Sequence, residues 1–215
     1  MLAEGPRGSL TKQLVARKGL DQGRNPQVYA IGVKELWEVP PGRIEPGTVV
    51  HTAGWPLAGD QFGGGWLYAM PEGMISMGLV SGLDYRDPAF DPHEAFQRYK
   101  THPFFRKILA GGKMLKYGAK TIPEGGWFSL PKLSTDGALL VGDSAGFLNS
   151  QRLKGIHLAI KSGMLAAETV FEALRREDFS EGFLGDYTRR VEQSWIKEEL
   201  WKARNYHQAF EGGMA

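Results

Sequence analysis

The stretch LLVGDSAGFLNSQRLKGIHLAIKSG, residues 139–163, constrains the fold of this chain more than any other part of the sequence. A short apolar run stops at Gly142, Asp143 follows at once, and a loop with two cations leads into a long run of helical character. One apolar stripe recurs there at spacings of three and four: Ile156, Ile160, Met164, Ala167 and Phe171. The stretch predicts, in order, a strand over 138–142, a loop over 143–155 and a helix over 156–174.

The acid in this arrangement indicates a particular kind of ligand. A helix N-terminus has unpaired N–H groups and the positive end of the helix dipole, so it attracts anions. A carboxylate just before it suits a sugar-alcohol hydroxyl beside another partly negative group, and FAD offers both. Asp143 alone fits a loop cap equally well, but Gly155 before the helix and Gly163 inside it favour a site. Arg152 and Lys154 could approach a phosphate, although surface loop cations are common.

The composition excludes several classes of protein. The 42% hydrophobic and 23% charged residues are those of a globular chain. Lys plus Arg number 26 against 24 Asp plus Glu, interleaved along the chain, which argues against a nucleic-acid partner. Because there is no cysteine, this chain supplies no disulfide and no iron–sulfur ligand, and the five histidines lack metal-ligand spacing. The 29 glycines and six tryptophans suit a cofactor enzyme, with a loop-rich β protein as the alternative.

The rest of the chain predicts a sheet flanked by helices. β-branched and aromatic runs between glycines and prolines predict an antiparallel sheet over 27–39, 48–55, 65–70 and 74–82, with a further strand at 114–120. Helical patterns cover 9–18, 91–102, 103–112 and 186–206.

Several ordered segments resemble one known family. They are HTAGWPL (51–57), FGGGWLY (62–68), GLDYRDP (82–88), YGAK (117–120), EGGWFSLPKL (124–133), the run from Leu139 to Glu168, and SWIKEELWKARN (194–205). In this order they resemble the central part of electron-transfer flavoprotein:ubiquinone oxidoreductase. Family members are membrane-surface flavoenzymes that take electrons from reduced electron-transfer flavoprotein and pass them to ubiquinone. They have an FAD domain, a quinone domain and a 4Fe–4S domain.

The resemblance implies an α/β fold and two groups of site residues. The fold is part of a Rossmann-like FAD domain of the flavoprotein hydroxylase and geranylgeranyl-reductase type, interrupted by an antiparallel-sheet domain. The implied FAD contacts are Glu4, Gly5, Gly142, Asp143, Gly146, Lys154, Gly155, Ile156 and His157. The implied quinone contacts are Phe62, Gly63 and Gly64, whose backbone N–H groups would meet a quinone carbonyl. A glycine-rich turn between strands is the alternative for the two glycines.

The resemblance also implies a partial enzyme. We expect FAD-domain pieces at 1–24 and 134–178, a quinone-binding domain at 25–133, and a helical segment at 179–215 that leads toward a membrane-contacting region. No G-x-G-x-x-G follows an opening strand, so the chain is expected to be inactive alone. The resemblance implies a location at the inner face of the bacterial cytoplasmic membrane, as a peripheral protein, or at the mitochondrial inner membrane in eukaryotic relatives. Two alternatives are another FAD-dependent reductase or hydroxylase, such as a prenyl-lipid reductase, and a non-catalytic binding fragment.

Overall fold

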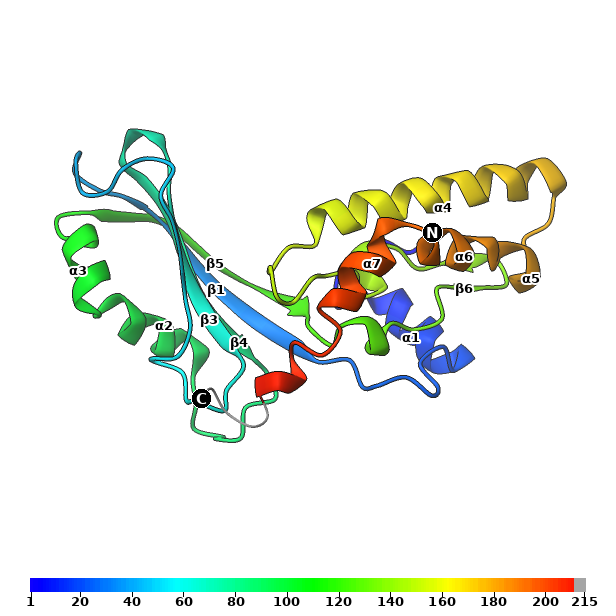
Figure 1. Cartoon of the computed structure of the whole chain (residues 1–215), viewed down its shortest axis with the longest axis horizontal. Helices are drawn as coiled ribbons and strands as arrows, with labels where there is room; N and C mark the ends of the chain where they lie inside the picture. The colour runs from blue at the N-terminus through cyan, green and yellow to red at the C-terminus, as the bar shows by residue number, and fades with distance from the viewer. Residues whose placement is uncertain (211–215) are drawn as a thin grey trace. The chain divides into compact units, whose positions relative to one another are not determined.

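The computed structural model describes residues 1–210, and these form two compact units (Figure 1). Unit 1 joins residues 1–29 to residues 122–209, whereas unit 2 comprises residues 30–121 and, among the described residues, Phe210. Each unit has its own hydrophobic cluster, as expected of separate domains. The end of the chain, 211–215, which belongs to the segment expected to lead toward a membrane, lies outside the described residues.

Unit 2 is built on a five-stranded sheet with the strand order β2-β3-β4-β1-β5. The strands are β1 (Tyr29–Glu38), β2 (Val49–Thr52), β3 (Gly63–Ala69), β4 (Met74–Gly82) and β5 (Lys113–Pro123). β3 pairs antiparallel with β2 and β4, and β4 pairs antiparallel with β1, from Ala30 opposite Gly82 to Glu38 opposite Met74. The antiparallel sheet predicted from the sequence is therefore confirmed.

Helices α2 (Pro92–Lys100) and α3 (Pro103–Leu109) lie along one face of this sheet (Figure 1). The Asp91 carboxylate accepts hydrogen bonds from the N–H groups of His93 and Glu94, and proline occupies the first helical position, where its missing N–H costs nothing. The core between the helices and the sheet includes Leu67, Ile75, Met77, Phe96, Tyr99 and Phe105. The two helices predicted here are confirmed, and a one-turn 3₁₀ helix, Pro71–Gly73, joins β3 to β4.

The glycine triplet at the start of β3 is required by packing inside unit 2. A Cβ on Gly64 would overlap with the carbonyl oxygen of Thr52, and a Cβ on Gly65 would overlap with the phenol ring of Tyr99. Tyr99 is buried, and its hydroxyl is 2.9 Å from the hydroxyl of Thr52 on β2. The triplet therefore has a structural reason that holds with or without a bound ligand.

We expect Gly65→Ala to lower the free energy of unfolding by about 1–3 kcal/mol, because the added methyl group overpacks the site above Tyr99. Urea denaturation of the purified variant measures this loss. In a Tyr99→Leu background, which removes the ring, the same glycine change should cost much less. Equal costs in both backgrounds would contradict the overlap with Tyr99 as the cause.

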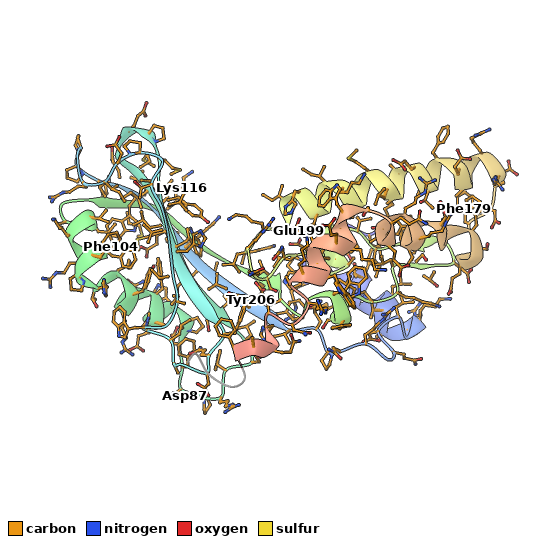
Figure 2. The ribbon with its side chains drawn as sticks, in the orientation of Figure 1. Asp87, Phe104, Lys116, Phe179, Glu199 and Tyr206 are labelled. Carbon is orange, nitrogen blue, oxygen red and sulfur yellow. The ribbon has the colours of Figure 1, made fainter. Side chains whose placement is uncertain are left out.

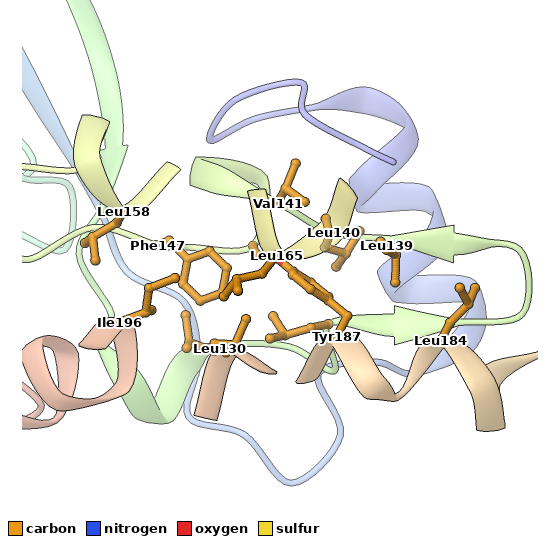
Figure 3. Close-up of a cluster of buried hydrophobic side chains, with 14 of the residues drawn as sticks. Leu130, Leu139, Leu140, Val141, Phe147, Leu158, Leu165, Leu184, Tyr187 and Ile196 are labelled. Atoms are coloured by element: carbon orange, nitrogen blue, oxygen red, sulfur yellow. The ribbon is translucent and has the colours of Figure 1, made fainter. Parts of the chain in front are cut away.

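Unit 1 consists of helices around a two-stranded β6–β7 sheet. Its elements are α1 (Ser9–Lys18), β6 (Ser134–Thr135), β7 (Ala138–Leu139), α4 (Ile156–Arg176), α5 (Glu181–Leu184), α6 (Asp186–Glu192) and α7 (Trp195–Lys202), with 3₁₀ turns Trp127–Ser129 and Gly142–Ser144. A further 3₁₀ turn, Gln208–Phe210, lies where the chain passes from unit 1 to unit 2. Figure 3 shows the core of this unit, a cluster of buried side chains that includes Phe147, Leu165 of α4 and Tyr187 of α6. The helix predicted over 156–174 is confirmed and continues to Arg176.

Two elements of unit 1 differ from the prediction. The predicted strand over 138–142 pairs as β7 only at its first two residues, and then Leu140 forms a parallel bridge with Leu2. The single helix predicted over 186–206 is wrong, because the chain breaks between α6 and α7 at Ser194. The Ser194 hydroxyl accepts a hydrogen bond from the N–H of Ile196, so it starts a new helix rather than continuing the old one.

Candidate functional site

The turn at Gly142 fixes the geometry at the end of the short β7 strand. Gly142 has φ +57°, a left-handed conformation that side chains other than glycine rarely adopt. Its N–H donates to the hydroxyl of Ser162 on α4 at 2.9 Å, so the turn is attached directly to the helix. Asp143 follows in this turn, as the sequence predicts.

Asp143 lies beside the start of α4. A Cβ added to Gly155, the residue before the helix, would lie 3.3 Å from Oδ1 of Asp143 and 3.2 Å from the carbonyl oxygen of Phe147. The intervening loop folds back on itself, because Asn149 and Lys154 exchange backbone hydrogen bonds of 3.0 and 3.3 Å. The structure therefore brings Gly142, Asp143 and Gly155 together, with Gly142 against Ala159 of α4 and Gly155 beside the carboxylate.

His157, in the first turn of α4, is held by a residue that the sequence did not single out. Its Nε2 is 2.9 Å from Oε1 of Glu199 on α7, and its ring stacks on Trp195 with a centroid distance of 5.7 Å. The amide of Asn149 donates to the same Glu199 oxygen at 2.9 Å (Figure 2 labels Glu199). Burial alone would raise the pKa of Glu199, but the hydrogen bonds from Asn149 and His157 hold it below the ordinary value. Glu199 therefore fixes both ends of the 149–157 segment.

The start of the chain lies next to the same turn. Leu2 donates to the carbonyl of Leu139 at 2.8 Å, and the Ser144 hydroxyl donates to the carbonyl of Gly5 at 3.1 Å. The carboxylate of Glu4 accepts from the N–H and hydroxyl of Thr11, which lower its pKa. Glu4 thus caps α1, so its predicted role at a flavin stays a prediction and its carboxylate has a structural task.

A cavity of about 460 Å³ opens between α1 and the Asp143 turn. Its lining includes Gly8, Thr11, Lys12, Arg24, Asn25, Gln27, Asp143, Ser144 and Gly146. The volume is that of a small-molecule site, and its walls combine apolar surface with two cations, two amides and two carboxylates, Asp21 and Asp143. That donor set fits part of a flavin nucleotide, since cations suit its pyrophosphate and Asp143 suits a sugar hydroxyl. Lys12 and Arg24 were missed by the sequence analysis, because nothing links α1 to the distant turn before folding.

The predicted quinone contacts lie in unit 2, at the start of β3. The Phe62 ring is buried and meets the ring of Phe210 edge-on at a centroid distance of 4.9 Å. The carbonyl of Phe62 accepts a hydrogen bond from the N–H of Gly82 at 2.9 Å. Gly63 and Gly64 follow as strand residues whose Cβ positions are filled by neighbouring backbone. A quinone role for these residues stays a prediction.

Neither a metal centre nor a membrane-spanning helix is visible within residues 1–210. No cluster of three or more potential metal-binding side chains occurs in this described part. None of the helices described there is both long and apolar enough to cross a bilayer.

Comparison with known sequences identifies close relatives of the whole chain. Residues 29–122 match the family described as "ETF-QO, ubiquinone-binding". The chain is 44% identical to a probable electron transfer flavoprotein-ubiquinone oxidoreductase of Acinetobacter baylyi, over 96% of this chain and 39% of that protein. It is 43% identical to the mitochondrial protein of that name from Homo sapiens, over 99% of this chain and 35% of that protein. The chain thus spans little more than a third of these relatives.

Comparison with solved structures supports the fold. A geranylgeranyl bacteriochlorophyll reductase-like protein from Thermoplasma acidophilum matches with a TM-score of 0.71 and 19% identity, over 86% of this chain and 44% of that one. The flavin-dependent brominase Bmp2 matches with a TM-score of 0.63 and 18% identity, over 95% of this chain and 49% of that one. At these identities the matches show the fold alone, and they confirm the predicted α/β class.

Proposed function

The chain is a partial homologue of the electron transfer flavoprotein-ubiquinone oxidoreductases, and on that premise we propose that it provides the flavin-contacting turn and the quinone-binding domain of such an enzyme. The observation that carries this proposal is the meeting of the Gly142–Asp143 turn with the start of α4, next to a cavity of about 460 Å³. The reaction is electron transfer from reduced electron-transfer flavoprotein to ubiquinone at a membrane surface.

In this proposal the bound FAD carries the redox chemistry, and the chain binds and orients it. Asp143 would accept a hydrogen bond from a ribitol hydroxyl, and Lys12 and Arg24, which line the same cavity, would neutralise phosphate charge. The first turn of α4, from Ile156 to His157, presents its N–H groups to the flavin. Gly5, Gly146 and Lys154 complete the proposed contacts.

Unit 2 contributes the quinone site in this proposal. Gly63 and Gly64 present backbone N–H groups to a quinone carbonyl, and the ring of Phe62 packs nearby. Because the sequence has no cysteine, the ligands of the 4Fe–4S cluster expected in the family come from a part of the enzyme outside this chain. The enzyme is then peripheral to the membrane that holds the quinone.

We expect the purified chain to retain a flavin absorption band after incubation with FAD and desalting. The Asp143→Ala variant should bind FAD about ten- to a hundredfold more weakly. The loss corresponds to one hydrogen bond to a charged group, about 1.5–3 kcal/mol. Titration of flavin fluorescence measures the affinity.

The matched control is Asp87→Ala, which removes an exposed aspartate from a loop of unit 2 (labelled in Figure 2). Equal flavin affinity in the Asp143 and Asp87 variants would contradict the proposed role of Asp143. An unmodified chain that retains no flavin would contradict flavin binding by these residues alone.

A second candidate function is that of a non-catalytic binding fragment, and it is favoured by the structural tasks of Glu4, which caps α1, and of the glycine triplet, which packing inside unit 2 requires. A quinone-reduction assay of the flavin-loaded chain separates the two candidates. The same preparation assayed with a prenyl-lipid substrate tests the alternative of a prenyl-lipid reductase.

A further inference from the structure

The carboxylate of Glu199 joins helix α7 to the loop that precedes α4. Its side chain is only 16% exposed. One carboxylate oxygen accepts a hydrogen bond from the amide of Asn149 at 2.9 Å, and the same oxygen lies 2.9 Å from Nε2 of His157. Asn149 is buried, and the ring of His157 stacks on Trp195 of α7. We call Glu199, Asn149 and His157 the clasp, because they hold the two ends of residues 149–157 at one carboxylate.

The loop inside the clasp is closed on itself and strained. The backbones of Asn149 and Lys154 exchange hydrogen bonds, and Oδ1 of Asn149 accepts the N–H of Arg152 at 3.1 Å. Leu153 has φ +53°, a left-handed conformation in which its Cβ approaches the backbone unfavourably. Such a conformation persists only where surrounding contacts hold it, and it is frequent at ligand sites. The clasp supplies such contacts at both ends of the loop.

The loop leads directly into the residues that face the flavin in the proposed function. Gly155 ends the loop, and a Cβ there would lie only 3.3 Å from Oδ1 of Asp143, so the two segments are in close approach. His157 belongs both to the clasp and to the first turn of α4. A displacement of His157 would therefore change the spacing between Asp143 and the start of α4.

We infer that Glu199 is a positioning residue for the flavin site, because its clasp holds the first turn of α4 against Asp143. Glu199 touches no flavin in this inference and acts through Asn149 and His157. Residues that contact a ligand must be held within about 0.5 Å of the productive geometry, and hydrogen bonds from neighbouring side chains provide that support. The inference deepens the proposed function, on which it rests, by adding a residue that the site needs but that lies on another helix.

Limited digestion with trypsin, without FAD, measures whether the clasp holds the loop. Arg152 and Lys154 are exposed trypsin sites inside the loop, and mass spectrometry identifies cleavage after each of them. We expect Glu199→Ala to speed this cleavage about tenfold, because it removes hydrogen bonds to a charged group and lets the loop open locally. The matched control, Glu198→Ala, removes the neighbouring glutamate, which pairs with Lys202 at the surface of α7, and should leave the cleavage rate unchanged.

Titration of flavin fluorescence then measures the effect of the clasp on the flavin site. We expect Glu199→Ala to bind FAD about tenfold more weakly than the unmodified chain, and Glu198→Ala to bind it equally well.

A third comparison exchanges the two partners of the clasp. Asn149→Asp alone places a second carboxylate against Glu199, so it should speed cleavage and weaken FAD binding. The double variant Asn149→Asp/Glu199→Gln exchanges the amide and the carboxylate, so the same hydrogen bond can form in the opposite direction. It should recover trypsin resistance and flavin affinity to within about threefold of the unmodified chain. A loss caused only by damage to the packing of α7 would not be recovered in this way.

Circular dichroism should show every variant folded, and if Glu199→Ala does not fold, Asn149→Asp and the double variant carry the same test. The inference is overturned if Glu199→Ala is cleaved no faster than Glu198→Ala. It is also overturned if the clasp variants are cleaved faster but bind FAD as tightly as the unmodified chain, or if the double variant recovers neither property.

The two assays also separate this inference from the proposed function. If the unmodified chain binds no FAD, the proposed function fails and the flavin role of Glu199 fails with it. The trypsin assay, which uses no FAD, would still show whether the clasp holds the loop. If the unmodified chain binds FAD and Glu199→Ala binds it equally well, only the positioning role of Glu199 fails.

Discussion

Replacing Lys100 with methionine is expected to lower the free energy of unfolding of unit 2 by about 3–5 kcal/mol. Nζ of Lys100 on α2 is 2.8 Å from both carboxylate oxygens of Glu35 on β1, and Glu35 is only 5% exposed. The indole N–H of Trp37 donates to the same carboxylate at 2.7 Å. Without the ammonium group, a charged carboxylate stays buried with one indole N–H as its remaining donor, and that uncompensated charge causes the loss.

Two further variants test the cause. Lys202→Met removes a lysine from an exposed i,i+4 pair with Glu198 on α7, and it should cost less than about 1 kcal/mol. The double variant Glu35→Gln/Lys100→Met removes both charges and keeps an acceptor for Trp37, so it should recover most of the loss. Urea denaturation measures all three. If Lys100→Met costs no more than Lys202→Met, the buried pair does not stabilise unit 2.

Replacing Glu124 with glutamine is expected to raise the free energy of unfolding at neutral pH, whereas most substitutions of buried polar residues lower it. Glu124 is fully buried at the end of β5, and neither carboxylate oxygen has a hydrogen-bond partner among the described residues. Burial raises the pKa of Glu124 well above its ordinary 4.5. The next residue, Gly125, donates its N–H to Gln27 at 2.8 Å, and Gln27 lines the candidate flavin cavity.

The pH dependence follows from the direction of this shift. The folded state binds the Glu124 proton more tightly than the unfolded state does, so the stability of the protein falls as pH rises above the unfolded pKa. Glutamine does not titrate, so the variant avoids this loss. Its free energy of unfolding at pH 7 should exceed that of the unmodified protein by at most about 3 kcal/mol, which is the cost of keeping an ordinary carboxyl group protonated at that pH. The gain should shrink toward zero near pH 4.5.

Urea denaturation of the two proteins between pH 4.5 and pH 8 measures this difference directly. Other carboxyl groups titrate equally in both and cancel. Glu192→Gln, at an exposed glutamate of the same unit, is the matched control and should show a difference that does not change with pH. If the stability difference between Glu124→Gln and the unmodified protein is equally independent of pH, the Glu124 carboxyl group has a hydrogen-bond partner or a water molecule in solution.

The sequence by itself determined the elements whose signals are local. The antiparallel strands, the helix that begins after Asp91 and the turn at Gly142 all follow from residues within a few positions of one another. Alternation, capping and positive φ are properties of short segments, so they can be recognised before any contact forms. The family resemblance rests on the same short motifs, and the sequence comparisons support it over nearly the whole chain.

Only the tertiary structure decided which distant residues meet. Periodicity revealed the apolar stripe on α4, but not that the core would take the opposite face and leave this one exposed. Glycine spacing did not reveal that Tyr99 fills the space above Gly65, and nothing near His157 in the sequence pointed to Glu199. The physical reason is the same in each case. The position of a residue in a helix or strand sets the direction in which its side chain leaves the backbone, whereas the residue that it contacts is set by packing between segments that are far apart in the chain.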